Sequence, residues 1–317
     1  MKKNCWVLGA GYMAKEYIKV LKTLPINLTI IGRGDEKINS LKNEFNVNAI
    51  SGGITTYINS KPELPEFAIV AVSCEELYKS TKQLIKLGIK NILVEKPAGM
   101  LLEEIRDLSK STEDNKINLF VGYNRRFYHS VDLLRKQIKE DGGIQSIHFE
   151  FSEWVQTIDT QKFPNEVLSR FLIANSSHVI DTVFFIAGKP KDYKFFSGGN
   201  FVKWHPSGSI FVGSGITENG IYFSYSSNWG APGRWAIEVL TSNSRYYLKP
   251  MEELAIQKKG SVDVNKVISD YQIDINYKPG LYNLLLAFLD KKNDSRLCHI
   301  KEHETNFCFY NLIGNYQ

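Results

Sequence analysis

The stretch Gly9-Ala10-Gly11-Tyr12-Met13-Ala14 decides the fold of the first part of this chain. It follows the apolar run Cys5–Leu8, which predicts a buried strand, and it opens a pattern of helical spacing. A G-x-G-x-x-A run in that position is typical of a dinucleotide-binding turn. Gly9 would make the tight turn, Gly11 would let the backbone approach a pyrophosphate, and Ala14 would let helix and strand pack closely. The residues expected to contact the cofactor here are Gly9, Gly11, Tyr12 and Met13.

Apolar strand-like runs alternate with helical stretches up to residue 121. Further buried strands are expected at Leu28–Ile31, Phe67–Val72, Ile92–Val94 and Leu119–Val121. Helices are expected before Pro25 and at about 35–45 and 75–87. Because no hairpin signal joins the strands, the pattern predicts a parallel sheet covered on both faces. We therefore predict an α/β Rossmann domain, a doubly wound sheet that binds NAD(P), over residues 1–121.

The pattern changes after about Gly122, and alternation with a period of two residues begins at Ile144. Four helices are also expected, at 131–139, 176–186, 281–290 and 303–313. These features predict an α+β domain over residues 122–317 with a large, mostly antiparallel open-faced sheet, although the last helices can pack back across the boundary. Its strands are expected at 147–151, Ile210–Ile216, Ile221–Trp229, Trp235–Leu240 and Ser244–Leu248.

Composition limits the function classes. The chain has 317 residues, which suits two domains, and its net charge of +5 is spread without a basic tail or patch. We therefore expect no nucleic-acid partner, and no apolar stretch approaches the ~20 residues that span a bilayer. The four cysteines lie far apart and are expected to be reduced in a cytoplasmic protein. His299 and His303 have i, i+4 spacing, but a metal site is not expected there.

The end of the second predicted strand bears on the choice of dinucleotide. NAD-dependent enzymes usually place a carboxylate there for the ribose hydroxyl, but this chain reads Ile31-Gly32-Arg33-Gly34 and has no acid before Asp35. Arg33 could pair with a 2′-phosphate, so NADP(H) is favoured and NAD(H) is the alternative. A solvent-facing arginine in a glycine loop is the other interpretation of the same residues.

Glu95-Lys96-Pro97 follows the strand Ile92–Val94, at the sheet edge where open α/β sheets bind ligands. Lys96 precedes a proline, which favours an extended backbone as the chain leaves the strand. A lysine in this place could reach a reacting hydroxyl or carbonyl group. The other cofactor contacts expected at this edge are Ser73, Glu95 and Lys96.

Polar residues open an apolar helix in the second part of the chain. His178 and Asp181 have i, i+3 spacing and share one helix face. An imidazole suits proton transfer near neutral pH, but the pair could equally cap and decorate the helix start. Tyr123, Arg125 and Arg126 follow the last Rossmann strand, and one or two of them are expected to contact substrate or phosphate.

Several stretches, taken in order, resemble the glucose–fructose oxidoreductase / inositol dehydrogenase / MocA (Gfo/Idh/MocA) family over almost the whole chain. The resemblance implies a Rossmann domain, NAD(P), and a sugar, nucleotide-sugar or cyclic polyol substrate. It also implies that Lys96 polarises the reacting oxygen, that His178 is the catalytic acid/base, and that the open-faced sheet forms a homo-oligomer, a dimer or tetramer. The matching stretches are Gly9–Ala14, Val94–Pro97, Val121–Phe127, Ser177–Asp181 and Lys278–Tyr282.

One position departs from the family pattern. An aspartate usually stands four residues before the histidine, where this chain has Ala174 with Asn175 beside it. The missing carboxylate leaves three alternatives: a rerouted proton relay, a non-sugar carbonyl or imine as the substrate, or a dinucleotide-binding regulatory protein without turnover. The residues expected to contact substrate are Lys96, Tyr123, Arg125, Asn175, His178 and Asp181.

Overall fold

A computed structural model describes residues 2–290 and 294–316, and the chain divides into two compact units. The first unit comprises Met1–Gly122 and Asn276–Glu304, and the second comprises Tyr123–Ile275 and Thr305–Gln317. The division after Gly122 lies one residue from the boundary predicted by sequence. The segment 276–304 groups with the first unit, and packing of the last helices back across the boundary was an alternative that the sequence left open.

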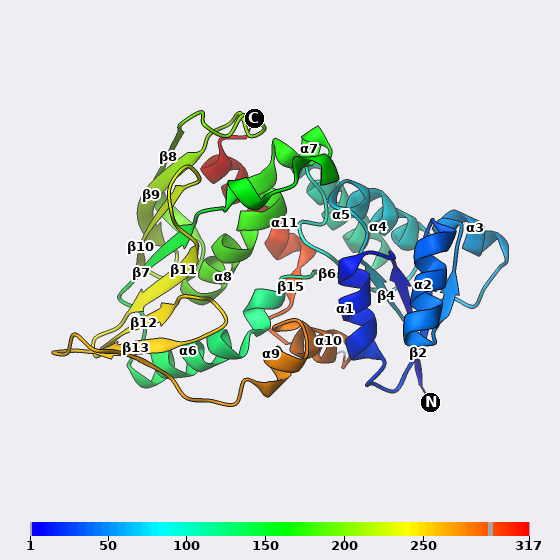
Figure 1. Ribbon diagram of the computed structural model, residues 1–317, viewed down its shortest axis with the longest axis horizontal. Helices are drawn as coiled ribbons and strands as arrows, with labels where there is room; N and C mark the ends of the chain where they lie inside the picture. Colours follow the sequence, from blue (N-terminus) through cyan, green and yellow to red (C-terminus); the bar gives the residue numbers. More distant parts are fainter. Residues whose placement is uncertain (1, 291–293, 317) are drawn as a thin grey trace. The chain divides into compact units, whose positions relative to one another are not determined.

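A parallel sheet forms the centre of the first unit, as predicted (Figure 1). Its strand order is β15-β6-β5-β4-β1-β2-β3, and only the short β15 runs antiparallel to its neighbour. The connection direction reverses between β1 and β4, and ligands of doubly wound sheets bind at such a reversal. The short strands β3 and β15 were not predicted. The strands are β1 (Lys3–Leu8), β2 (Ile26–Ile31), β3 (Asn48–Ile50), β4 (Phe67–Val70), β5 (Asn91–Val94), β6 (Asn118–Val121) and β15 (Cys298–His299).

Amphipathic helices connect these strands. Sequence analysis did not anticipate α5, whose apolar stripe is short and whose first turn is acidic. Its start is held by Glu104, whose Oε2 accepts hydrogen bonds from the backbone N–H groups of Met100 (2.8 Å) and Leu101 (3.2 Å). The helices are α1 (Tyr12–Leu21), α2 (Asp35–Phe45), α3 (Gly53–Asn59), α4 (Leu77–Lys86), α5 (Leu102–Asn115) and α10 (Leu281–Leu289).

The returning segment 276–304 joins the first unit through apolar contacts. Helix α10 packs against α1, and the Phe288 ring meets the rings of Phe67 and Phe120 with centroids 5.3 and 6.3 Å apart. Strand β15 then pairs with β6. Because α10 is apolar on several faces, it needs a partner surface that its own neighbours along the chain do not supply.

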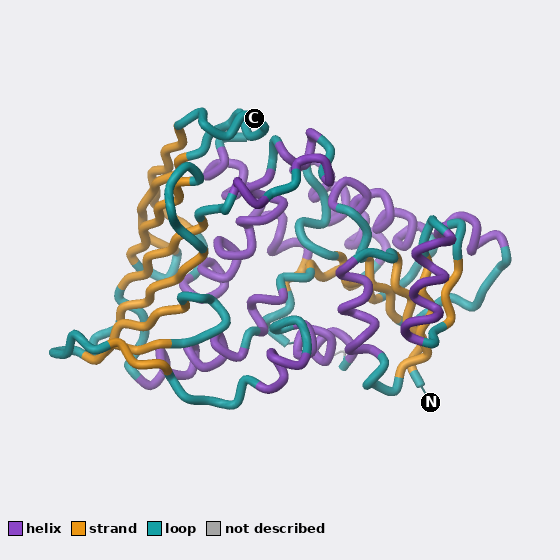
Figure 2. The backbone as a smooth tube through the Cα atoms, in the orientation of Figure 1, coloured by secondary structure: helices purple, strands orange, loops and turns teal. Residues whose placement is uncertain are grey.

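The second unit contains an eight-stranded sheet in the order β14-β13-β12-β11-β7-β10-β9-β8, shown as a ladder of orange strands in Figure 2. All neighbours are antiparallel except β7 and β10, which confirms the mostly antiparallel sheet. Strands β8, β13 and β14 were not predicted. The strands are β7 (Ser146–Phe151), β8 (Pro190–Gly198), β9 (Ile210–Thr217), β10 (Tyr222–Asn228), β11 (Trp235–Leu240), β12 (Ser244–Leu248), β13 (Ala255–Lys258) and β14 (Val264–Lys266).

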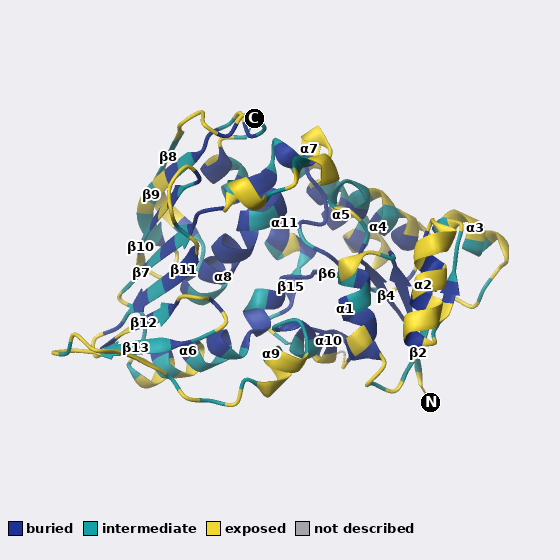
Figure 3. Cartoon of the chain, viewed as in Figure 1, coloured by how far each residue is buried: buried dark blue, intermediate teal, exposed yellow. Residues whose placement is uncertain are grey.

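One face of this sheet is covered. Ile147, Phe149 and Phe151 of β7 are buried while the residues between them are half-buried, and α8 contacts β7 and β11 (Figure 3). A π-helical turn, Leu172–Ser176, leads into α8. Among the described residues no helix has the length and apolar character needed to cross a membrane. The remaining α-helices are α6 (His129–Glu140), α7 (Asn165–Leu168), α8 (Ser177–Ala187), α9 (Gln272–Asn276) and α11 (Ile300–Gly314).

Candidate active site

The turn after β1 requires a glycine at position 9. Gly9 has φ +125°, and a Cβ added there would lie 2.2 Å from the carbonyl oxygen of Ala71. Its N–H donates to the Ile31 carbonyl (2.9 Å), so the turn is tied to the ends of both flanking strands. The backbone therefore turns sharply at the sheet edge that carries the strand C-termini.

Gly11 and the start of α1 fit a phosphate group. No described heavy atom outside its chain neighbours lies within 4 Å of where a Gly11 Cβ would stand. No side chain among residues 2–290 and 294–316 caps α1, and its first turn carries no acidic residue. The first N–H groups of a helix lack partners inside the helix and carry partial positive charge, so they bind anions. Ala14 is fully buried, as the predicted close packing requires.

Arg33 extends from the end of β2 into solvent. Its side chain is 74% exposed, and its Nη1 lies 3.4 Å from Oε2 of Glu76. Ser73 follows β4 and donates a 2.5 Å hydrogen bond to Glu75. Tyr12 is exposed at the start of α1, and the Lys278 ammonium group lies 5.2 Å from the centre of its ring. The predicted cofactor residues that follow β1, β2 and β4 thus belong to one unit.

A buried carboxyl group stands at the end of β5. Glu95 is 8% exposed, and its Oε1 accepts a 2.7 Å hydrogen bond from the Tyr17 hydroxyl. Burial raises the pKa of Glu95, while the Tyr17 hydrogen bond and the charges of Lys96 and Lys278 oppose that rise. A Cβ on Gly122 would lie 3.2 Å from the Tyr17 oxygen, so glycine leaves room for this pair.

Lys96 is half-buried, and the segment behind it is anchored by a histidine that sequence analysis assigned no role. His303 is fully buried, and its Nε2 lies 2.9 Å from the Pro97 carbonyl oxygen. His299 instead packs its ring edge against Phe120, with centroids 5.7 Å apart. No three His, Cys, Asp or Glu side chains of the described residues are grouped to hold a metal ion. His303 thus belongs to the core of the first unit.

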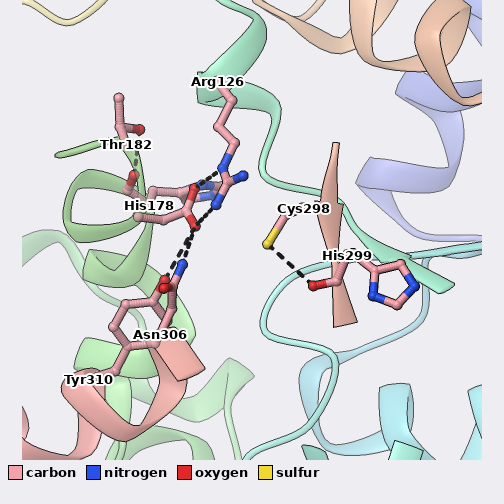
Figure 4. Close-up of polar contacts among 8 residues, drawn as sticks. Arg126, His178, Thr182, Cys298, His299, Asn306 and Tyr310 are labelled. Carbon is pink, nitrogen blue, oxygen red and sulfur yellow. Dashed lines mark hydrogen bonds and ion pairs between the residues drawn. The ribbon is translucent and has the colours of Figure 1, made fainter. Parts of the chain in front are cut away.

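In the second unit, Asp181 forms a fully buried ion pair with Arg126. Arg126 donates from Nε and Nη2 to the two carboxylate oxygens of Asp181, both at 2.7 Å. Asn306 and Tyr310 approach the same carboxylate at 3.4 Å, and Figure 4 shows these side chains converging on it. Asp181 was expected to contact substrate, but this geometry uses its oxygens to hold α8 to the segment Asn124–Phe127 and to α11.

Tyr123, Arg125 and His178 come together around an indole ring. The His178 ring is 5.9 Å from the Tyr123 ring and 6.1 Å from the Trp235 ring, centroid to centroid. The Arg125 guanidinium lies 4.5 Å from the centre of Trp235, within cation–π range. His178 is 7% exposed, and burial lowers the pKa of Arg125. Three of the predicted substrate residues thus share one polar and aromatic cluster.

Glu153 was missed by sequence analysis. It lies two residues beyond β7, is 3% exposed, and accepts hydrogen bonds from Asn175 Nδ2 (3.1 and 3.0 Å) and from the Ser176 hydroxyl (2.6 Å). Arg234 Nη1 lies 3.8 Å from its Oε2. Burial raises the pKa of Glu153 to about 7 against these favourable contacts. Local sequence patterns could not identify Glu153, because its hydrogen-bond partners come from other elements.

Comparisons with known proteins agree with the fold of the chain. Residues 3–123 match the Gfo/Idh/MocA family, described as an oxidoreductase family with an NAD-binding Rossmann fold. Among curated protein sequences, none matches this chain. Three solved structures share the fold of the whole chain at identities of 12–17%.

The dehydrogenase MviM of Clostridium difficile has 17% identity and a TM-score of 0.77, covering 100% of both chains. The WlbA dehydrogenase of Bordetella pertussis, solved with NADH and UDP-GlcNAcA, has 12% identity and a TM-score of 0.76, covering 99% of this chain and 95% of its own. UDP-N-acetylglucosamine 3-dehydrogenase GnnA of Acidithiobacillus ferrooxidans has 12% identity and a TM-score of 0.74, covering 99% and 97%. At these identities the likeness concerns the fold. Residues 3–123 therefore match the NAD-binding Rossmann domain of the Gfo/Idh/MocA family of oxidoreductases.

Proposed function

We propose that this protein interconverts a secondary hydroxyl group and a ketone of a sugar, nucleotide sugar or cyclic polyol, using NAD(P). The observation that carries the proposal is the glycine turn after β1, with its open space at Gly11 and its uncapped helix start among the described residues. When bound, the nicotinamide ring supplies the carbon that accepts or donates hydride. The sugar-type substrate is supported by the sugar nucleotides named for two similar structures.

The cofactor would be held by the first unit. The N–H groups at the start of α1 would bind its pyrophosphate, with Gly11 leaving room for close approach. Arg33 would bind a 2′-phosphate, which makes NADP(H) the preferred form; its exposed guanidinium at the end of β2 supports this assignment. Ser73 and Glu95 belong to the same sheet edge because they follow β4 and β5.

Two side chains would act on the reacting oxygen. Lys96 would donate a hydrogen bond from its ammonium group and stabilise negative charge that develops on this oxygen. His178 would accept the hydroxyl proton at an imidazole nitrogen during oxidation and return it during reduction. Tyr123, Arg125 and Asn175 would orient the substrate. Tyr123 and Arg125 share the aromatic cluster with His178, and Asn175 lies three residues before His178 and donates to Glu153.

The experiment is a two-stage test on the full chain. Intrinsic tryptophan fluorescence is titrated with NADPH and NADH, and the preferred cofactor is then assayed against sugars, nucleotide sugars and cyclic polyols in both directions. Binding of NADPH with turnover of a carbohydrate supports the proposal. Binding of neither dinucleotide would refute it.

A dinucleotide-binding regulatory protein is the second candidate, and Ala174 favours it because the usual carboxylate is missing there. Binding without turnover of any carbohydrate, carbonyl or imine would select this candidate. In either case we propose a homo-oligomer formed through the open face of the second sheet. The exposed apolar residues Phe196, Val212 and Tyr222 share that face by their pairing register. Light scattering of the purified chain tests the oligomer.

A further inference from the structure

We propose that Glu153 is a positioning residue for His178: its buried carboxyl group holds the turn that leads into α8, and its charge shifts the proton affinity of the imidazole. This inference rests on the proposed function only for the catalytic use of His178. The placement of Glu153 itself follows from its contacts inside the second unit.

The carboxyl group is held from two sides. Asn175 and Ser176, at the end of the π-helical turn, donate to it from the segment directly before α8. Arg234 approaches its Oε2 at 3.8 Å from the chain that enters β11. Because His178 lies two residues after Ser176, the carboxyl group fixes the backbone from which the imidazole projects.

Arg234 and Trp235 link the two titratable groups. The Arg234 guanidinium lies 3.8 Å from Glu153 Oε2 and 4.8 Å from the centre of the Trp235 ring. The Trp235 ring in turn lies 6.1 Å from the His178 ring. In a protein interior, ionisation of one group changes the energy of ionising a neighbouring group.

The charged and titratable groups around Glu153 come from several elements. Arg234 precedes β11 and Arg125 lies in Asn124–Phe127, and both favour the carboxylate form of Glu153. His178 on α8 and Tyr123 complete the set at the cluster. Burial opposes these contacts and keeps the Glu153 pKa near 7, so the group changes charge where a histidine also titrates.

The consequence is that the ionisation of His178 depends on the charge of Glu153. An ionised Glu153 favours the imidazolium form of His178, whereas a protonated Glu153 removes that stabilisation. The pair then takes up and releases protons in two coupled steps rather than two independent ones. This would give His178 a carboxyl partner although position 174 carries only a methyl group.

The test is a pH titration of the full chain by NMR, observing labelled histidine ring resonances from about pH 5 to about pH 9. His178 is assigned by loss of its signal in His178→Gln. In the wild type we expect two steps in the His178 curve. In Glu153→Gln we expect one step, with its midpoint lower by about 0.5–1 pH unit. Glu153→Asp, which keeps a carboxyl group, should retain two steps.

Glu238→Gln is the matched control. Glu238 lies on β11 and pairs with Arg245, away from the cluster, so its loss should leave the His178 curve unchanged. A His178 curve that is identical in wild type and Glu153→Gln would overturn the proposal. If Glu153→Gln does not fold, labelled glutamate δ-carbons decide: besides the raised signal of Glu95, assigned by its loss in Glu95→Gln, a second must titrate about 2 pH units above the others.

The pH dependence of turnover supplies an independent test of the proposal. Once a substrate is known, Glu153→Gln should change the pH profile of kcat/KM without changing NADPH affinity, which a purely structural defect would not do selectively. The NMR result does not require turnover. Inactivity toward every substrate would therefore count against the proposed function and leave the Glu153–His178 coupling to be judged separately.

Discussion

The turn after β1 and the cluster around His178 present different kinds of polar group: backbone in the first and side chains in the second. In the first unit, the candidate phosphate site consists of glycine backbone and helix N–H groups, with open space beside Gly11. In the second unit, the polar groups are side chains that are nearly or fully buried, including Asp181, Glu153 and His178. A backbone site gains its selectivity from shape, whereas a buried side-chain site must satisfy every charge it contains.

This difference separates binding from stability. Adding atoms at Gly11 should block a ligand without disturbing the core, because nothing described is displaced. Changing a buried charge of the second unit should alter the free energy of unfolding as well as the chemistry. Variants in the two units therefore test the comparison directly.

The largest effect is expected on turnover. His178→Ala should lower kcat by about 10²–10⁴-fold with dinucleotide affinity nearly intact, because general acid–base catalysis is lost. Lys96→Ala should be at least as harmful, since substrate positioning is lost as well. Steady-state kinetics with a substrate found in the screen would measure both.

The matched control is His148→Ala. His148 lies on β7, where its Nδ1 contacts the Ser224 hydroxyl at 3.0 Å, and its loss should leave kcat unchanged. Ala174→Asp is measured in the same assay. A gain in kcat would show that the missing carboxylate limits turnover. Unchanged turnover in His178→Ala would remove the catalytic assignment.

The next effect is on stability. Asp181→Asn leaves the fully buried Arg126 without its carboxylate, which should lower the free energy of unfolding by about 3–5 kcal/mol. Urea denaturation followed by tryptophan fluorescence measures the change. Glu44→Gln, which breaks the exposed pair with Lys15, should cost less than about 1 kcal/mol. A stable Asp181→Asn protein with a raised KM would restore Asp181 to the substrate site.

Glu153 should make the stability of the protein depend on pH. Its pKa is about 7 in the folded protein and 4.5 as the ordinary value, so between these pH values the folded state binds more protons than the unfolded state. Stability from this group is then present at low pH and falls as pH rises, by about 3 kcal/mol in total. Glu153→Gln should remove the fall and be favoured over the wild type more at pH 8 than at pH 5. The same difference in free energy of unfolding between Glu153→Gln and the wild type at both pH values, measured by denaturation, would contradict this.

Gly11→Val tests the backbone site. A branched side chain in the space beside the α1 start should weaken NADPH binding more than about 100-fold, close to 3 kcal/mol, while thermal stability stays near the wild type. Gly198→Ala on β8, also beside open space, serves as the control for inserting a side chain. Fluorescence titration that finds unchanged affinity in a folded Gly11→Val protein would reject the glycine turn as the phosphate site.

The smallest effect concerns cofactor preference. Arg33→Ala should reduce the ratio of NADPH to NADH affinity by about tenfold, because one charge-assisted contact to the 2′-phosphate is lost. Glu76→Gln removes the competing ion pair and should keep or strengthen NADPH binding. Equal affinities for both dinucleotides in the wild type would discard the NADP(H) preference.

Local patterns account for the features that sequence analysis predicted. The glycine turn, the strands of the first sheet and the alternating strands of the second depend on residues that are neighbours along the chain, so periodicity and motif spacing reveal them. Strand β8 and helix α5 were missed although α5 buries one face, Ile105 and Leu108 among its residues, and burial alternates along most of β8.

The amino-acid sequence by itself determined the succession of the main strands in both sheets, the glycine turn, and the residues Lys96 and His178 as candidates. Only the tertiary structure decided how their neighbours are paired and charged. Tyr17 and Glu95 are 78 residues apart, and His303 and Pro97 are 206 apart. Asp181 became a partner of Arg126, and Glu153 became a carboxyl group with a pKa near 7. Burial and ion pairing depend on which distant segments surround a side chain, and no local pattern of residues carries that information.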